Sequence, residues 1–178
     1  VRDDGTHYVA MSEAHATGHV NTTYAEGGDA YVGGLIGHFE GSEFTDISAT
    51  GDVTSTTGNE VGGLVGRVQM ERNNDIVANA SATGNVTTTG QQVGGLIGYH
   101  TGGSVETSYA RGNVSTDGDY VGGLIGQSTN LVADSYARGD VTSSGDEVGG
   151  LVGRHDDEAT RVYASGRVEG GSTVGGLV

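Results

Sequence analysis

The chain has 178 residues, a net charge of −15, 35 glycines, and neither proline nor cysteine. The charge argues against nucleic acid and anionic membranes as partners, and the lack of cysteine excludes disulfides and thiolate metal ligands. No apolar run is long enough to form a membrane-spanning helix, so no membrane insertion is predicted for this segment.

All eight basic residues are arginine, and lysine is absent. Like charges on a compact chain repel one another, and molar salt weakens that repulsion because it shortens the Debye length to about 3 Å. An acidic, lysine-free composition therefore predicts that the protein comes from a halophile.

Two short motifs alternate along the chain, 26 to 33 residues apart. Ala-x-Gly-x-Val begins at Ala16, Ala49, Ala82, Ala110, Ala137 and Ala164. Val-Gly-Gly-Leu-(Ile/Val)-Gly begins at Val32, Val61, Val93, Val121 and Val148, and a shortened copy starts at Val174. This spacing indicates a stack of similar units in place of one closed core. Residues 1–178 are interpreted as a single array, an internal part of a longer chain, with coils at about 8–37, 38–66, 67–98, 99–126, 127–153 and 154–178.

One unit illustrates the local structure expected in each coil. Segments 105–110, 113–116 and 120–125 are rich in β-branched and aromatic residues, and glycines separate them. Three short strands per repeat predict an all-β fold, a parallel β-solenoid (β-helix) of about six coils. Right-handed winding is favoured because parallel crossovers are overwhelmingly right-handed.

Apolar residues recur at fixed positions and define the expected core. Valine columns start at Val20 and Val32, a leucine column at Leu35, and an alanine column at Ala16. Val121 and Leu124 are three residues apart, so strict alternation would place them on opposite faces of a strand. Either the two intervening glycines bend the chain and bring both inward, or the leucines form an exposed apolar stripe.

Two repeats carry insertions, which mark corner loops. The stretch between Gly66 and Ala82, containing residues 67–75, and the stretch between Ala16 and Val32 are longer than their equivalents. Insertions in solenoids map to corners, often on a binding face.

The two motifs together resemble the GLUG motif, in which Val-Gly-Gly-Leu-(Ile/Val)-Gly accompanies Ser-Tyr-Ala-x-Gly-x-Val. The Ser-Tyr-Ala part is complete at Ser108 and Ser135 and degenerate in the other copies. The resemblance covers nearly the whole chain. It implies a β-solenoid stalk or adhesive region of a secreted or cell-surface protein, and it brings no catalytic residues.

Calcium is the cofactor that the side chains could hold, because it prefers oxygen ligands from corner loops. Asp117 and Asp119 flank a glycine turn, and Asp146 and Glu147 occupy the corresponding turn of the next coil. These four residues are the candidate metal ligands. No other cofactor and no catalytic motif is predicted.

Four Asn-x-Ser/Thr sequons are candidate glycosylation sites, which must face solvent in a secreted protein. They are Asn21, Asn79, Asn85 and Asn113.

The sequence therefore predicts a non-enzymatic structural or adhesive solenoid segment, extracellular or on the cell surface, that self-associates or continues along the same solenoid. A first alternative is a module that binds a surface glycan or another cell through the corner loops near Thr22 and Arg67. A second is an accessory repeat region of a large secreted enzyme. An enzyme of the β-helix polysaccharide-lyase type is disfavoured because the arginines do not cluster with carboxylates on one strand face.

Overall fold

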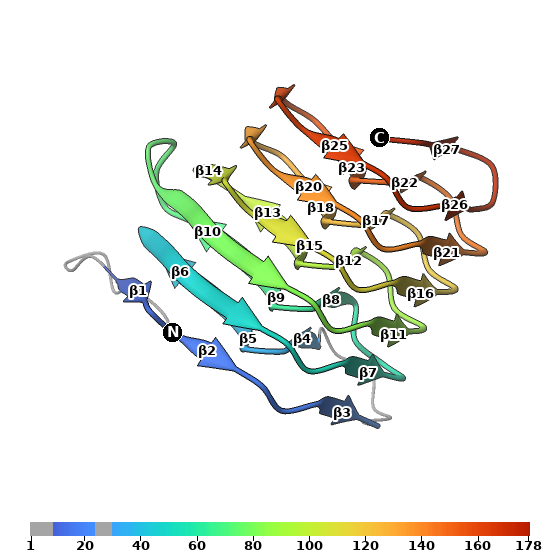
Figure 1. Ribbon diagram of the computed structural model, residues 1–178, viewed down its shortest axis with the longest axis horizontal. Coiled ribbons are helices and arrows are strands. Elements are labelled where there is room, and N and C mark those ends of the chain that lie inside the picture. The colour runs from blue at the N-terminus through green and yellow to red at the C-terminus, as the bar shows by residue number, and fades with distance from the viewer. Residues whose placement is uncertain (1–8, 24–29) are drawn as a thin grey trace.

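The computed structural model describes residues 9–23 and 30–178, which form a parallel β-solenoid (Figure 1). In this described part every strand pairs in parallel with its counterpart one coil away, in register, as in the pairing of Val86 with Val114 and of Val121 with Val148. The expected all-β fold is confirmed. The described residues contain no helix long and apolar enough to cross a membrane.

The described strands form four sheets that run along the solenoid. The first contains β1 (Ala10–Ser12), β2 (His15–Ala16), β6 (Glu43–Ala49), β10 (Ile76–Ala82), β14 (Ser104–Glu106), β15 (Tyr109–Ala110), β19 (Val132–Ala133), β20 (Tyr136–Ala137), β24 (Ala159–Thr160) and β25 (Tyr163–Ala164). The second contains β3 (Val20–Thr22), β7 (Val53–Ser55), β11 (Val86–Thr88), β16 (Val114–Thr116), β21 (Val141–Ser143) and β26 (Val168–Glu169).

The third and fourth sheets follow from the second motif. The third contains β4 (Tyr31–Gly33), β8 (Glu60–Gly62), β12 (Val93–Gly94), β17 (Val121–Gly122), β22 (Val148–Gly149) and β27 (Val174–Gly175). The fourth contains β5 (Ile36–Gly41), β9 (Val65–Met70), β13 (Ile97–Thr101), β18 (Ile125–Ser128) and β23 (Val152–His155).

The three strand segments expected in each coil lie close to where the sequence placed them, but two of them bend, and the third extends past residue 125 to Ser128. The third segment bends at Gly123 and Leu124, so its two halves, β17 and β18, belong to different sheets. The first segment also bends, because one residue per coil has a positive φ; these residues are Glu13, Asp46, Asn79, Thr107, Asp134 and Arg161.

The bend at the glycine pair settles the direction of the leucine column. Leu64, Leu96, Leu124 and Leu151 are fully buried, in one apolar cluster with the alanine column. The two valine columns pack together in a second buried cluster. The leucine column and the two valine columns therefore all point inward, and the alternative of an exposed leucine stripe is wrong.

The pairing of the two motifs has a steric reason. Gly123 lies against the side chain of Ala137, and a Cβ on Gly123 would stand 2.9 Å from that of Ala137 and 2.3 Å from the carbonyl oxygen of Gly150. The second glycine of one motif and the alanine of the other are therefore small for the same reason: they face each other across a narrow interior.

Candidate functional site

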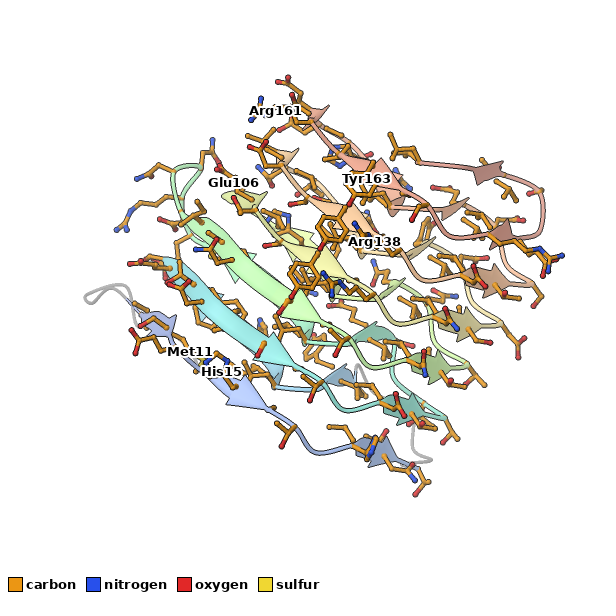
Figure 2. The ribbon with its side chains drawn as sticks, viewed as in Figure 1. Met11, His15, Glu106, Arg138, Arg161 and Tyr163 are labelled. Atoms are coloured by element: carbon orange, nitrogen blue, oxygen red, sulfur yellow. The ribbon has the colours of Figure 1, made fainter. Side chains whose placement is uncertain are left out.

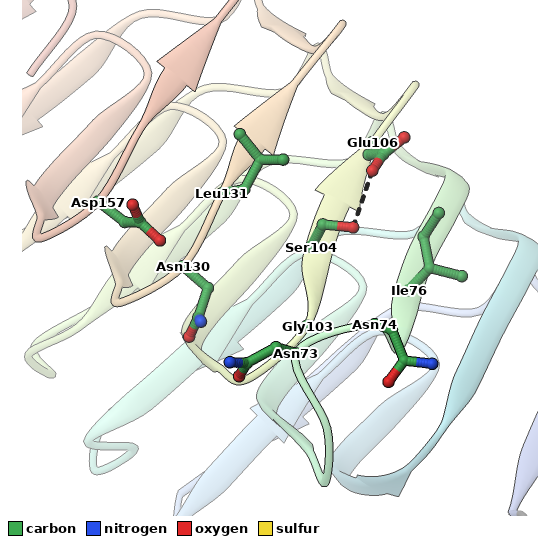
Figure 3. Close-up of a pocket in the computed structure, with 9 residues that line it drawn as sticks. All are labelled: Asn73, Asn74, Ile76, Gly103, Ser104, Glu106, Asn130, Leu131 and Asp157. Atoms are coloured by element: carbon green, nitrogen blue, oxygen red, sulfur yellow. Dashed lines mark hydrogen bonds between the residues drawn. The ribbon is translucent and has the colours of Figure 1, made fainter.

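An open groove of about 410 Å³ lies at a corner of the solenoid, beside the insertion that follows β9 (Figure 3). Its lining comes from four successive coils: Asn73, Asn74, Ile76, Gly103, Ser104, Glu106, Asn130, Leu131 and Asp157. A second hollow of about 260 Å³ adjoins it and shares Asn74 and Ile76. The groove thus runs along the stacking direction, beside the beginnings of strands β10, β14, β19 and β24 of the first sheet.

The insertion forms one wall of the groove. Asp75 is buried, and its Oδ2 accepts hydrogen bonds from the backbone N–H groups of Glu71 (3.1 Å) and Arg72 (2.8 Å). These bonds close the loop 71–75 on itself and place Asn73 and Asn74 at its tip.

The next coil turns more tightly and leaves the groove open. Gly102 and Gly103 have positive φ values of 73° and 63°, and a Cβ on Gly103 would lie 2.5 Å from the carbonyl oxygen of Asp75. A two-glycine turn is therefore required where the longer loop packs over it.

Hydrogen bonds hold two of the polar groups in the groove. Asn130 Oδ1 accepts from Gly102 N–H (2.7 Å) and from Thr129 Oγ1 (2.8 Å), which leaves its amide nitrogen as a donor. Ser104 Oγ donates to Glu106 Oε1 (2.9 Å). Half-buried Ile76 and Leu131 add apolar surface between these groups. Amides, hydroxyl and carboxylates beside aliphatic side chains suit a neutral ligand rich in hydroxyl groups.

The position of the insertion differs in detail from the sequence-based prediction. Strand β9 continues to Met70, so the loop consists of residues 71–75, and Arg67 belongs to the strand. Arg67 donates to Glu60 (2.8 Å) and lies over the ring of Tyr99 (4.9 Å). The prediction of a loop around Arg67 is therefore wrong, because residues 67–70 continue strand β9. The repeat pattern does not show how long this strand is. The other insertion, beyond Thr22, includes residues 24–29, which lie outside the described residues.

The four candidate calcium ligands lie at one corner, as their repeat positions predicted. Asp119 Oδ1 accepts from Asp146 N–H (2.7 Å), and Asp146 Oδ1 accepts from the backbone (2.9 Å) and hydroxyl (2.6 Å) of Ser172. The hydroxyl bond from Ser172, followed by its N–H bond, lowers the pKa of Asp146. Asp117 Oδ1 has a long contact with Ser144 Oγ (3.4 Å), and Glu147 stands at a positive φ of 56°.

Asp119 and Asp146 therefore each bind a backbone N–H of the next coil. Within residues 9–23 and 30–178, no group of three or more His, Cys, Asp or Glu side chains is arranged to hold a metal ion. Calcium binding at Asp117, Asp119, Asp146 and Glu147 stays a prediction, which titration calorimetry with calcium chloride would test.

Two of the sequon asparagines belong to a second capping ladder. Asp52 Oδ1 accepts from Asn85 N–H (2.8 Å), Asn85 Oδ1 from Asn113 N–H (2.9 Å), and Asn113 Oδ1 from Asp140 N–H (2.9 Å). The capping uses only the amide oxygen, so the nitrogen that carries an N-linked glycan lies outside it.

The four sequon asparagines are all exposed. Asn79 differs from the ladder pair because its Nδ2 donates to Asp46 Oδ1 (3.0 Å). Glycosylation of Asn21, Asn79, Asn85 and Asn113 stays a prediction.

Sequence reasoning missed most of the groove. Glu106, Asn130, Leu131 and Asp157 belong to three coils that carry no insertion, and nothing in their repeat positions sets them apart. The insertion itself was the available signal, since its neighbours in the stack are the same positions of the following coils.

Comparison with known proteins agrees with the repeat pattern. The model of the GLUG motif family matches residues 28–54, 89–115 and 117–142. Three segments of the chain are thus similar to the GLUG motif. Each matched segment contains one strand of the third sheet, one of the fourth and the strand or strands of the first, and it ends within a strand of the second sheet. The family pattern therefore spans one whole coil.

A curated relative extends this agreement. Over 101 residues, 55% of this chain, the array is 83% identical to "Halomucin" from Haloquadratum walsbyi (strain DSM 16790 / HBSQ001). The chain matches only 1% of that protein's length. The relative comes from a halophilic archaeon, in agreement with the predicted high-salt origin. No solved structure matches the chain.

Proposed function

We propose that the GLUG array is a non-enzymatic structural segment of an extracellular, mucin-like surface protein. The main support is the ladder of backbone pairing in the second sheet. From β3 to β26, each strand pairs in parallel with the equivalent residues of the next coil. Each coil contacts mainly its neighbours, so such a ladder extends by simple addition of coils and yields a stiff rod. The 83% identity to a short part of halomucin supports a repeated structural role in a much longer protein.

Location and shape can be tested on native material. An antibody against residues 99–153 should label the outside of intact cells of the source organism, and cryo-electron microscopy in molar salt should show straight rods. Labelling only after cell lysis, or globular particles without rods, would contradict the proposal.

The corner groove supports a second candidate function, binding of a glycan. The lining combines side-chain amides, a hydroxyl, two carboxylates and two aliphatic side chains. Such surfaces bind neutral sugars by hydrogen bonds to hydroxyl groups and by apolar contact, and two carboxylates would repel an acidic sugar. We infer that the ligand is a neutral saccharide.

Shortening the loop tests the second candidate. Gln69 pairs with Thr101 and Ile76 with Ser104, so replacing Met70–Asp75 by Gly-Gly copies the turn of the following coil. The solenoid should therefore fold while the wall of the groove is removed. We expect saturation-transfer NMR with neutral oligosaccharides to show contact with the parent chain and about tenfold weaker binding by the variant. The matched control is Asp52→Asn, which lies at a different corner and keeps its capping oxygen. Equal binding by the parent and the loop variant would exclude the groove.

A further inference from the structure

A row of stacked tyrosines lies on the outer side of the first sheet. The rings of Tyr109 and Tyr136 are 5.1 Å apart and those of Tyr136 and Tyr163 are 5.0 Å apart, with interplanar angles of 5° and 6°. The stacking follows from the strand register, which pairs these positions in three successive coils. Figure 2 shows the rings running along the solenoid next to Arg138.

Two arginines complete this surface, the Tyr–Arg row (Tyr109, Arg111, Tyr136, Arg138 and Tyr163). Arg111 lies over the ring of Tyr109 (4.7 Å) and donates to Tyr136 Oη (3.1 Å). Arg138 repeats the arrangement one coil later, over Tyr136 (5.0 Å) and bonded to Tyr163 Oη (3.0 Å). The guanidinium groups are thus held in place by the rings, and most of their donors are left for another partner.

The charge of these two arginines is not compensated locally. Among the described residues, Arg67, Arg154, Arg161 and Arg167 each form an ion pair with a carboxylate, whereas Arg111 and Arg138 form none within 4.0 Å. Both side chains are exposed, on a chain whose net charge is −15. A fixed, exposed pair of guanidinium groups favours two carboxylates at the same spacing.

The chain itself presents such carboxylates. Asp119 and Asp146 occupy one position in the same two coils that supply Arg111 and Arg138, so the two pairs share the spacing of one coil, about 4.8 Å. Each aspartate caps a backbone N–H through Oδ1, and its Oδ2 is not used in that cap. The aspartates lie beyond the second sheet from the arginines, so one molecule cannot join its own two surfaces.

We propose that the Tyr–Arg row docks onto the Asp119–Asp146 corner of a second copy of the solenoid, side by side. The contact joins two different surfaces, so a pair of molecules still has one unoccupied copy of each surface. Further copies can therefore add, which builds arrays of parallel rods. Molar salt favours the contact because it screens the long-range repulsion between acidic chains and leaves charge pairs at contact distance less affected. The proposal rests on the structural function above, to which it adds the partner.

Sedimentation velocity of the whole chain, from low to molar salt, tests this docking with two paired variants. Arg111→Gln with Arg138→Gln removes the cations, and Asp119→Asn with Asp146→Asn removes the anions while keeping the capping oxygens. We expect the parent to associate in molar salt and each paired variant to associate about tenfold more weakly. The aspartate variant is diagnostic, because its lower net charge would by itself promote association.

Two controls carry the same charge changes elsewhere. Arg161→Gln with Arg167→Gln and Asp52→Asn with Asp140→Asn should associate like the parent. A parent that stays monomeric in every salt, or paired variants that match the controls, would overturn the docking. A monomeric parent that binds dextran sulfate through Arg111 and Arg138 would also overturn it and would assign the row to an anionic glycan. Surface labelling and rod shape would be unaffected by any of these results, so they test the proposed function separately.

Discussion

Gly123→Ala is expected to destabilise the solenoid by about 3 kcal/mol. The added Cβ would stand 2.3 Å from the carbonyl oxygen of Gly150 and 2.9 Å from the Cβ of Ala137. Neither neighbour is the end of a flexible side chain. The carbonyl belongs to the adjoining coil, whose Leu151 carbonyl accepts a hydrogen bond from Leu124 N–H (2.8 Å), so relief of the clash requires the coils to separate. Urea unfolding at constant salt, followed by circular dichroism, measures the loss.

The same motif supplies a matched control. Gly176 occupies the position of Gly123 in the last coil, and a Cβ there would meet no atom within 4 Å. Gly176→Ala should therefore change the unfolding free energy by less than about 0.5 kcal/mol. Equal effects of the two substitutions would show that the glycines serve chain flexibility and not coil packing.

Acidification from pH 6.5 to 4 is expected to cost about 3 kcal/mol of stability through His100. This side chain is fully buried, and burial lowers its pKa from 6.5 to about 4. Between these values the unfolded chain binds a proton that the folded chain does not bind. The contribution of neutral His100 is therefore complete above pH 6.5 and is lost as the pH falls toward 4.

The hydrogen bonds of His100 agree with the neutral form. Its Nδ1 lies 3.0 Å from Ser128 Oγ, which itself donates to the carbonyl oxygen of Asn130 (3.0 Å). Ser128 Oγ therefore accepts from Nδ1–H. Among the described residues, Nε2 has no hydrogen-bond partner. The cost of burying the charged ring outweighs the nearby backbone of Gly102, which favours the proton, so the pKa of His100 stays low.

His100→Val isolates this contribution. Val68 fills the same interior position one coil earlier, so valine suits the site. The unfolding free energy of the variant should vary by about 3 kcal/mol less than that of the parent between pH 6.5 and 4. An unchanged pH dependence would assign the acid sensitivity to other groups. The carboxyls of Asp134 and Asp146, whose pKa values are lowered by hydrogen bonds from Arg161 and Ser172 respectively, lose their contributions as the pH falls through a lower range, below their unfolded pKa of 3.8.

Several structural features could be predicted because the repeat places equivalent residues of neighbouring coils side by side. The register that pairs Val121 with Val148 and Ala110 with Ala137 follows directly from the phase of the two motifs. The corner that brings Asp119 next to Asp146 follows for the same reason. The groove does not follow, because its wall is the single loop 71–75 and its floor comes from coils of ordinary length.

The sequence by itself determined the parallel solenoid, the phase of its coils and the identity of its apolar columns. These depend only on the repeat, since the spatial neighbour of each residue is the same position in the next copy. The tertiary structure decided the direction of Leu124, the division into four sheets, the burial of His100 and the alignment of the Tyr–Arg row. Each of these depends on how sharply the chain bends within a coil, and that bend is set by packing across the interior, such as the contact of Gly123 with Ala137.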